Sequence, residues 1–144
     1  MSDMGPVWLG MFQDSHIAEN SMAYFLCAGY PRDAAEKMGA SLNTFIFAQD
    51  GENFLMTVVS PAAKRVNILC FNLGQKTEIT RKHGTSITSL FEWHDEERKL
   101  SAFFCPEDGD PFEMHFSFNE TYQTIHRYRK AGPVESRTIM HRLA

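Results

Sequence analysis

Residues 41–60, SLNTFIFAQDGENFLMTVVS, carry the strongest single indication of the fold. Two runs rich in β-branched and aromatic residues, 41–48 and 53–60, flank the polar segment QDGE. An Asp-Gly pair readily adopts the positive φ angles that a tight turn between antiparallel strands needs. This stretch therefore predicts a β-hairpin.

Segments of the same kind fill the rest of the chain after the hairpin. Short breaks rich in turn residues separate them at a spacing of about ten residues, as in an up-and-down β structure. The predicted strands are 65–73, 74–81, 85–93, 98–104, 111–118, 121–128 and 134–143. With a further strand predicted at 6–14, the sequence predicts about ten strands. A sheet of this size is expected to close into a barrel with an internal cavity, because closure removes its exposed edges.

The segment between the first strand and the hairpin predicts two short helices, at about 16–39. Pro31 suits the first turn of the second helix, and Gly39 suits its end. Ser15 or Ser21 is expected to cap the first helix. We expect this helix-turn-helix to form a lid over one mouth of the barrel.

Composition narrows the class of protein. The length of 144 residues predicts one domain spanning 1–144. A net charge of -4 and a pI near 5.8 argue against nucleic acid as a partner. No secretory signal or membrane-spanning stretch is visible in the sequence. Cys27, Cys70 and Cys105 lie far apart and are expected to be buried free thiols in a reducing compartment, which predicts a cytoplasmic protein.

The order of one strand, two short helices and nine strands resembles that of the intracellular lipid-binding proteins. The residues that carry the resemblance are WLGMF (8–12), ENSMAYFLCAGYP (19–31), FNLGQKTEI (71–79) and HRLA (141–144). The resemblance covers nearly the whole chain. It implies an all-β, lipocalin-like (calycin) barrel of ten antiparallel strands that binds a fatty acid or related hydrophobic ligand without catalysis.

The sequence departs from that family at several positions. Asp14 stands where an apolar residue is usual, and Ser21 stands where an aromatic residue is usual. The resemblance implies a ligand carboxylate held by an arginine on the eighth strand and an Arg-x-Tyr on the tenth. The eighth strand has no arginine here. The tenth offers either Arg137 with Ile139, or Thr138 with Met140, so the full set is absent.

Alternation along the eighth strand predicts which side chains point inward. Phe112, Met114, Phe116 and Phe118 share one face, which must be the buried one. If Phe118 faces Tyr122 across a three-residue loop, the even-numbered residues of the ninth strand also point inward. These are Thr124, His126 and Tyr128. If Lys130 then faces Val134, the inward residues of the tenth strand are Ser136, Thr138 and Met140.

The same alternation turns the arginines of this region outward. Arg127 and Arg129 would form a solvated charge ladder with Glu113 and Glu135 on the outer surface. An arginine inside the barrel would need a desolvated anion beside it. Arg137 is also expected to point outward, but a one-residue bulge near AGP (131–133) would turn it inward, so it stays a candidate.

The predicted ligand contacts combine lid, wall and polar residues. They are Phe25, Met38, Met114, Phe116, Phe118, Thr124, His126, Tyr128, Ser136, Arg137, Thr138 and Met140. The polar members could hold a head group, or could satisfy one another and buried water. The aromatic members could line a cavity or fill it.

Several functional alternatives remain open. The leading hypothesis is a carrier of a fatty acid or other hydrophobic small molecule, without cofactor or metal, monomeric, and touching membranes only transiently through the lid. A second is a barrel packed shut by its Phe and Met residues that acts as a protein-interaction module. A third is a small β-barrel enzyme or haem binder. No nucleophile elbow, HExxH motif or phosphate-binding glycine loop occurs in the sequence, so no catalytic residue is predicted.

Overall fold

The hairpin expected at residues 41–60 is present in the structure, a computed structural model that describes residues 6–80 and 84–144. Asp50 pairs with Asn53, and the two residues between them make the turn. Gly51 has a φ angle of 64°, which favours a residue without a side chain. The Asp-Gly signal therefore places this turn correctly.

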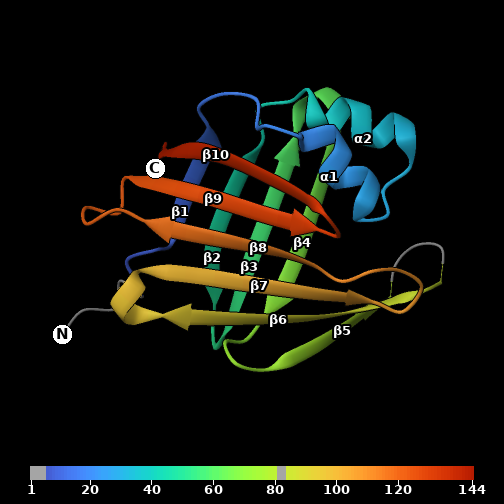
Figure 1. Ribbon diagram of the computed structural model, residues 1–144. Helices are drawn as coiled ribbons and strands as arrows, with labels where there is room; N and C mark the ends of the chain where they lie inside the picture. The colour runs from blue at the N-terminus through green and yellow to red at the C-terminus, as the bar shows by residue number, and fades with distance from the viewer. Residues whose placement is uncertain (1–5, 81–83) are drawn as a thin grey trace.

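The described residues form ten strands, two α-helices and two short 3-10 turns (Figure 1). The strands are β1 (Gly10–Asp14), β2 (Thr44–Asp50), β3 (Asn53–Ser60), β4 (Arg65–Phe71), β5 (Lys76–Thr80), β6 (Ser86–His94), β7 (Lys99–Pro106), β8 (Phe112–Phe118), β9 (Thr124–Ala131) and β10 (Val134–Arg142). The helices are α1 (Ser21–Cys27) and α2 (Arg32–Gly39), and the 3-10 turns are η1 (Pro61–Ala63) and η2 (Asp95–Glu97).

One antiparallel sheet contains these strands in the order β4-β3-β2-β1-β10-β9-β8-β7-β6-β5. Pairing of β1 with β10 joins the two ends of the chain, and β2–β4 run across the direction of β6–β10 in Figure 1. Within residues 6–80 and 84–144, no ladder joins β4 to β5, and we call this line the seam. One isolated bridge, Leu73 to Phe91, lies at its end. The predicted all-β, ten-stranded up-and-down barrel is confirmed, with the seam left open.

The lid lies between β1 and β2 as predicted, but it is shorter. Helix α1 starts at Ser21 rather than near residue 16. Neither Ser15 nor Ser21 caps it, because Asn20 occupies the N-cap position with a φ angle of 52°. The predicted boundary and cap of the first helix are therefore wrong.

The second helix is bracketed by the two predicted residues, although Pro31 is its N-cap and not part of its first turn. Pro31 precedes α2 and Gly39 ends it. A Cβ atom on Gly39 would lie 2.8 Å from the backbone nitrogen of Met22 in α1. Glycine at this position therefore lets the two lid helices pack closely.

Residues 15–20, which we call the strap, follow β10 from the end of β1 to the start of α1. The backbone N–H of Ser15 donates to the carbonyl oxygen of Ile139 at 2.8 Å. The side-chain amide of Asn20 donates to the carbonyl oxygen of Glu135 at 3.0 Å. The strap therefore takes the place of β1 beside β10 after β1 has ended, and it donates hydrogen bonds to backbone carbonyl groups of β10.

The register of the last three strands differs from the predicted one at two turns. Phe118 pairs with Ile125 and not with Tyr122, and Val134 pairs with Ala131 rather than with the residue before it. Each of these register shifts is an odd number of residues, and an odd shift reverses which face of a strand points inward. The two errors cancel at β10, so the predicted orientation is right for β10 and wrong for β9.

Aromatic side chains fill the middle of the barrel. Phe45 and Phe47 of β2 contact Phe116 of β8, with ring centroids 5.4 and 5.2 Å apart. Phe12 of β1 contacts Phe118 of β8 at 5.6 Å. The strands of each pair are three or four positions apart in the sheet, so these contacts cross the interior.

Other inward-facing side chains keep part of their surface exposed. They are Val58, Leu69, Ile79 and Met114, each paired in its ladder with a buried residue. A side chain that points inward is reached by solvent only where space lies beside it. The interior is therefore filled at the level of Phe116, while these four side chains leave some apolar inner surface open to solvent.

Two surface features bear on where the protein works. Cys27, Cys70 and Cys105 are free but exposed, so the prediction that they are buried is wrong. Next to Cys70 on the outer face of β4, Val66 and Ile68 are 61% and 63% exposed. Within the described ranges, the structure contains no helix long and apolar enough to cross a membrane.

Candidate binding site

Two arginines of β9 point into the barrel. Arg127 pairs with Phe116 of β8, and Arg129 pairs with Met114. Arg127 is 2% exposed and Arg129 is 1% exposed. The sequence-based prediction that both face water is wrong, because the turn between β8 and β9 is longer than assumed.

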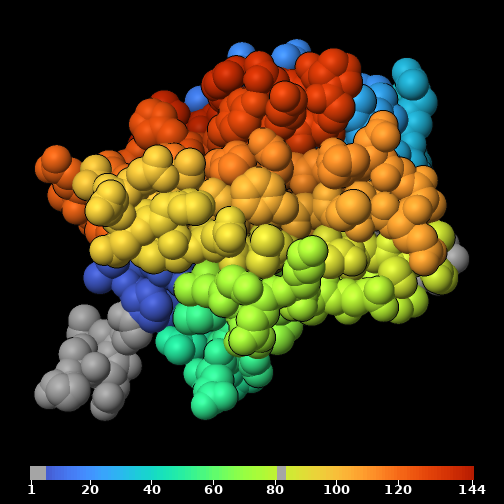
Figure 2. Space-filling view, turned by 60° about the horizontal axis from the view of Figure 1, so that its bottom comes forward, coloured from blue at the N-terminus to red at the C-terminus, as the bar shows by residue number. Residues whose placement is uncertain are grey.

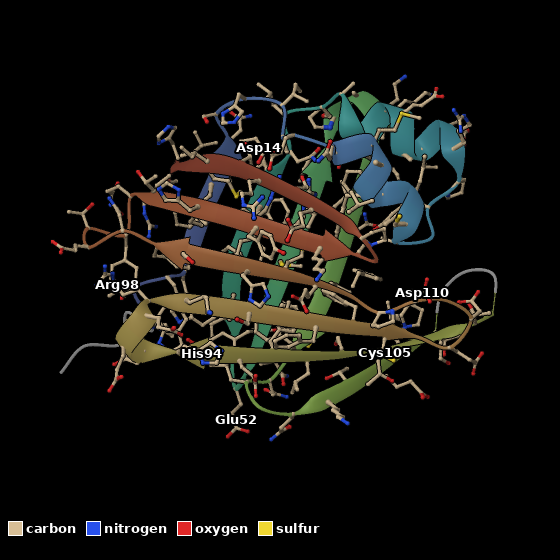
Figure 3. All side chains as sticks on the ribbon, in the orientation of Figure 1. Asp14, Glu52, His94, Arg98, Cys105 and Asp110 are labelled. Carbon is tan, nitrogen blue, oxygen red and sulfur yellow. The ribbon has the colours of Figure 1, made fainter. Side chains whose placement is uncertain are left out.

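Arg127 is paired with a buried carboxylate. Its Nη1 donates to Oδ1 of Asp14 at 2.8 Å, and the guanidinium lies 4.8 Å from the ring centroid of Phe45. The other carboxylate oxygen of Asp14 accepts the backbone N–H of Asn43 at 3.0 Å. Asp14 lies where β1 ends and the strap begins (Figure 3), and it is buried, as the apolar residue usual at this position would be.

Arg129 has no carboxylate partner among the described residues. Its Nη2 donates to the hydroxyl oxygens of Ser21 and Ser136, both at 3.2 Å. The guanidinium lies 4.5 Å from the ring centroid of Tyr24 and 4.9 Å from that of Phe25, both in α1. These contacts satisfy part of the guanidinium but do not neutralise it.

The site has one net positive charge, since two guanidinium groups share one carboxylate within the described chain. Burial, and next the charge of Arg127, lowers the pKa of Arg129. Burial also raises the pKa of the Tyr24 hydroxyl. Four buried polar atoms of the described site lack a hydrogen-bond partner: Nε and Nη2 of Arg127, Nε of Arg129 and Oη of Tyr24. The site therefore has spare donors and an unmatched charge.

The structure places eight of the predicted ligand contacts inside the barrel or lid, and four outside. The inward or buried residues are Phe25, Met38, Met114, Phe116, Phe118, Ser136, Thr138 and Met140. The outward residues are Thr124, His126, Tyr128 and Arg137. The predicted inward orientation of Thr124, His126 and Tyr128 is wrong, and the bulge that would turn Arg137 inward is not present.

The outer face of β9 and β10 forms the charge ladder instead. Tyr128 donates its hydroxyl to Oε2 of Glu135 at 2.6 Å. Arg137 lies 3.6 Å from Glu135 and 3.3 Å from Glu19 of the strap. Lys130, rather than Arg129, is the basic residue opposite Glu135 in the ladder.

A second polar group on the outer face has the connectivity of a hydrolase triad. Oγ of Ser101 lies 2.8 Å from Nδ1 of His115, and Nε2 of His115 lies 3.3 Å from Oε1 of Glu113. Ser101, however, is 1% exposed, and β7 is paired on both sides, so its backbone N–H groups serve the ladders. Access and oxyanion donors are both needed for acyl transfer, so this geometry does not support it.

Histidines do not build a metal centre in the part of the chain that the structure describes. The sequence placed His115 and His126 on opposite faces, whereas the structure puts both on the outer face. Among residues 6–80 and 84–144, no group of three or more His, Cys, Asp and Glu side chains could hold a metal ion.

Two grooves open at the surface and are lined mainly by outward-facing residues. One, of about 540 Å³, follows the outward side chains of β5–β9, and Figure 2 views β5–β8 on this side of the molecule. Its lining includes Lys76, Leu90, Phe103 and Glu113, which are neighbours across successive strands. The other, of about 590 Å³, lies between the strap and the outer face of β8–β10. Arg127 belongs to the lining of the second groove, whereas Arg129 lines neither.

Comparison with solved structures identifies the fold. A lipid-binding protein of Caenorhabditis elegans, LBP-8, superposes with a TM-score of 0.78 at 15% identity, covering 94% of each chain. A Schistosoma mansoni fatty acid binding protein in complex with arachidonic acid gives 0.78 at 18% identity, over 95% of this chain and 96% of that one. The chain has the fold of the intracellular lipid-binding proteins.

This lipid-binding fold also occurs in a secretary abundant heat soluble protein of Ramazzottius varieornatus, with a TM-score of 0.79 at 16% identity and 94% of each chain covered. The sequence itself matches no family model and no curated protein. At this level of identity the comparison establishes the fold, and the chemistry of the interior depends on this chain's own residues.

Within the lipid-binding fold, the interior arginines of this chain come from an unexpected strand. The resemblance implies arginines on β8 and β10, whereas this chain places both on β9. The sequence contained two signals of the change, namely the departures at Asp14 and Ser21. Asp14 contacts Arg127 and Ser21 contacts Arg129, so each departure accompanies one interior arginine.

Proposed function

We propose that the protein is a carrier that binds a fatty acid or related amphipathic carboxylate inside the barrel, without covalent chemistry. The observation that supports this proposal is Arg129, which is buried and has no carboxylate partner among the described residues. An uncompensated buried charge is unfavourable, and an anion beside it removes that penalty. A carboxylate is the natural ligand of a guanidinium because it accepts two parallel hydrogen bonds.

The unpaired atoms around Arg129 match such a head group. Arg129 and Arg127 keep N–H donors without a partner. The hydroxyl of Tyr24, a residue of α1, is also without one. A carboxylate has four lone-pair positions to accept from these groups. We infer that the head group binds between β9 and α1.

The hydrocarbon chain would run from the head group along the partly exposed inner wall. Met114 is the neighbour of Arg129 on β8, and Val58, Leu69 and Ile79 have inward surface that solvent still reaches. Two proteins of the same fold are described as fatty acid binding proteins, one of them with arachidonic acid bound. A flexible apolar chain suits this surface, since Met and aliphatic side chains adapt to it.

We further propose that the carrier is a single-domain, monomeric, cytoplasmic protein that meets membranes only transiently through α1 and α2. The three exposed thiols support a reducing compartment, because exposed cysteines remain free there. The basic residues of α2 are few, and Arg32 pairs with Glu36 at 3.5 Å, so strong attraction to anionic membranes is not expected.

A second candidate is a closed barrel that acts through protein contacts. The rings that cross the interior, such as Phe45 against Phe116, fill space that a ligand chain would otherwise use. Val66 and Ile68 present apolar surface on the outer face of β4. These two observations are the ones that support an interaction module.

Titration of delipidated protein with oleate and with oleyl alcohol distinguishes the two candidates. A carrier binds one oleate per chain. Its affinity for the uncharged alcohol should be lower by about tenfold or more, because the charge-assisted hydrogen bonds are lost. Arg129→Met should reduce oleate affinity to that of the alcohol. Arg137→Met, which removes an exposed arginine, is the matched control and should bind like the wild type. Binding of neither compound by the wild type would contradict the carrier and favour the closed barrel.

A further inference from the structure

The two departures from the family pattern contact the two interior arginines. Asp14 in β1 and Arg127 are 113 residues apart in sequence, and Ser21 and Arg129 are 108 apart. One departure supplies a charge and the other only a hydroxyl. The two arginines are therefore not equivalent, although they lie on the same strand and face.

Asp14 behaves as an anion built into the protein. One of its oxygens accepts from Arg127 at 2.8 Å, and the other accepts the backbone N–H of Asn43 at 3.0 Å. The carboxylate is almost completely buried, so water does not screen its charge. Arg127 is thus neutralised before any ligand arrives, and Arg129 keeps the unmatched charge.

We propose that Asp14 determines the head-group specificity of the barrel by restricting it to a single negative charge. This inference rests on the proposed function, in which an anion binds at Arg129. A monoanionic carboxylate neutralises the site. A dianion, such as the phosphate of a monoalkyl phosphate, would leave one negative charge buried beside the Asp14 carboxylate.

The charge balance predicts how substitutions shift this preference. Asp14→Asn keeps the shape of the side chain but leaves both guanidinium groups unmatched, which suits a dianion. Asp14→Asn combined with Arg127→Gln removes both charges of the pair and leaves Arg129 with its single charge. The preference of the double variant should therefore return to that of the wild type.

Calorimetric titration with hexadecanoate and hexadecyl phosphate tests the proposal. At about pH 8 the phosphate is mostly dianionic, since its second pKa is near 6. Wild type should bind hexadecanoate about tenfold more tightly than hexadecyl phosphate, and Asp14→Asn should shift that ratio about tenfold or more toward the phosphate. Glu19→Gln, which removes an exposed carboxylate of the strap, should leave the ratio unchanged.

The titration distinguishes failure of the proposed role of Asp14 from failure of the proposed function. An unchanged ratio in Asp14→Asn, with hexadecanoate still bound by the wild type, overturns the role of Asp14 and leaves the proposed function standing. Binding of neither amphiphile by the wild type overturns both. If Asp14→Asn does not fold, the wild type and the double variant decide, because a phosphate preference in either one overturns the proposal.

Discussion

The inner face of β9 and the outer face of its neighbour β10 hold arginines in opposite circumstances. On the inner face, Arg127 and Arg129 are buried, and their partners are specific buried groups of β1, α1 and β10. On the outer side of the same sheet, the Arg137 side chain is 58% exposed and shares its charge between two exposed glutamates. Water can replace any outer partner but none of the inner ones. The same residue type is therefore expected to be critical on one face and dispensable on the other.

The largest effect is expected from Arg127→Met. The change leaves the Asp14 carboxylate buried without its cation, and we expect the free energy of unfolding to fall by about 3–5 kcal/mol. Urea unfolding followed by tryptophan fluorescence measures it. Asp14→Leu combined with Arg127→Met removes both charges and should recover most of the loss. A single variant as stable as the wild type would show that the pair is not buried as described.

A smaller effect is expected from the inner hydroxyl that contacts Arg129. Ser21→Ala removes an acceptor of a buried guanidinium N–H, and should lower the free energy of unfolding by about 1–2 kcal/mol. Ser15→Ala, in the exposed strap, is the matched control and should lower it by less than about 0.5 kcal/mol. Equal effects of the two changes would mean that the inner and outer serines do not differ.

Removal of the outer arginine should have little effect. Arg137→Ala breaks two exposed ion pairs, and we expect the free energy of unfolding to change by less than about 0.5 kcal/mol. The same urea titration at low and at high salt checks it, because any contribution should shrink as salt screens the charges. A loss comparable to that of Arg127→Met would refute the comparison.

The smallest effect concerns the outer pair of Tyr128 and Glu135. The hydroxyl of Tyr128 donates to the charged form of Glu135 and lowers the pKa of that carboxyl. Its stabilisation is therefore present above the usual glutamate pKa and is lost as the pH falls through the lowered value. Tyr128→Phe should move the pKa of Glu135 upward, as an NMR titration of its side-chain carboxyl would show. An unchanged titration would indicate that the bond is not formed in solution.

Local signals in the sequence were sufficient for most of the fold. The Asp-Gly turn, the Pro31 and Gly39 helix bracket and the alternating aromatic residues of β8 each depend on neighbouring residues only. Such signals determine where a strand lies and, for β8, which face is buried.

The orientation of β9 could not be obtained in the same way. Its inward residues are Ile125, Arg127, Arg129 and Ala131, so neither face is uniformly apolar and alternation gives no answer. The turn before it then decides, and that turn is longer than its sequence suggests. Asn119 accepts the backbone N–H groups of Gln123 and Thr124, while Tyr122 has a φ angle of 59°. A connection held by one side chain is difficult to distinguish from a tight turn by sequence alone.

The candidate site was therefore only partly predictable. Ser136 and Met140 were placed correctly, because the two register errors cancel. The arginines were placed on the wrong face, although the reasoning that a buried arginine requires an anion still applies to them. Asp14 and Ser21 were visible as departures from a pattern, but their partners lie more than a hundred residues away and become neighbours only when the barrel closes.

The seam between β4 and β5 should determine where the barrel opens locally and exchanges its amide protons. Elsewhere the strands are joined by ladders, whose amide protons exchange with deuterium only when strands separate. Along the seam the facing edges of β4 and β5 can spread apart without breaking a ladder. Isotope should therefore enter these two edges before it enters β9, which is paired on both sides. On this expectation the buried arginines of β9 lie away from the side of the barrel that opens.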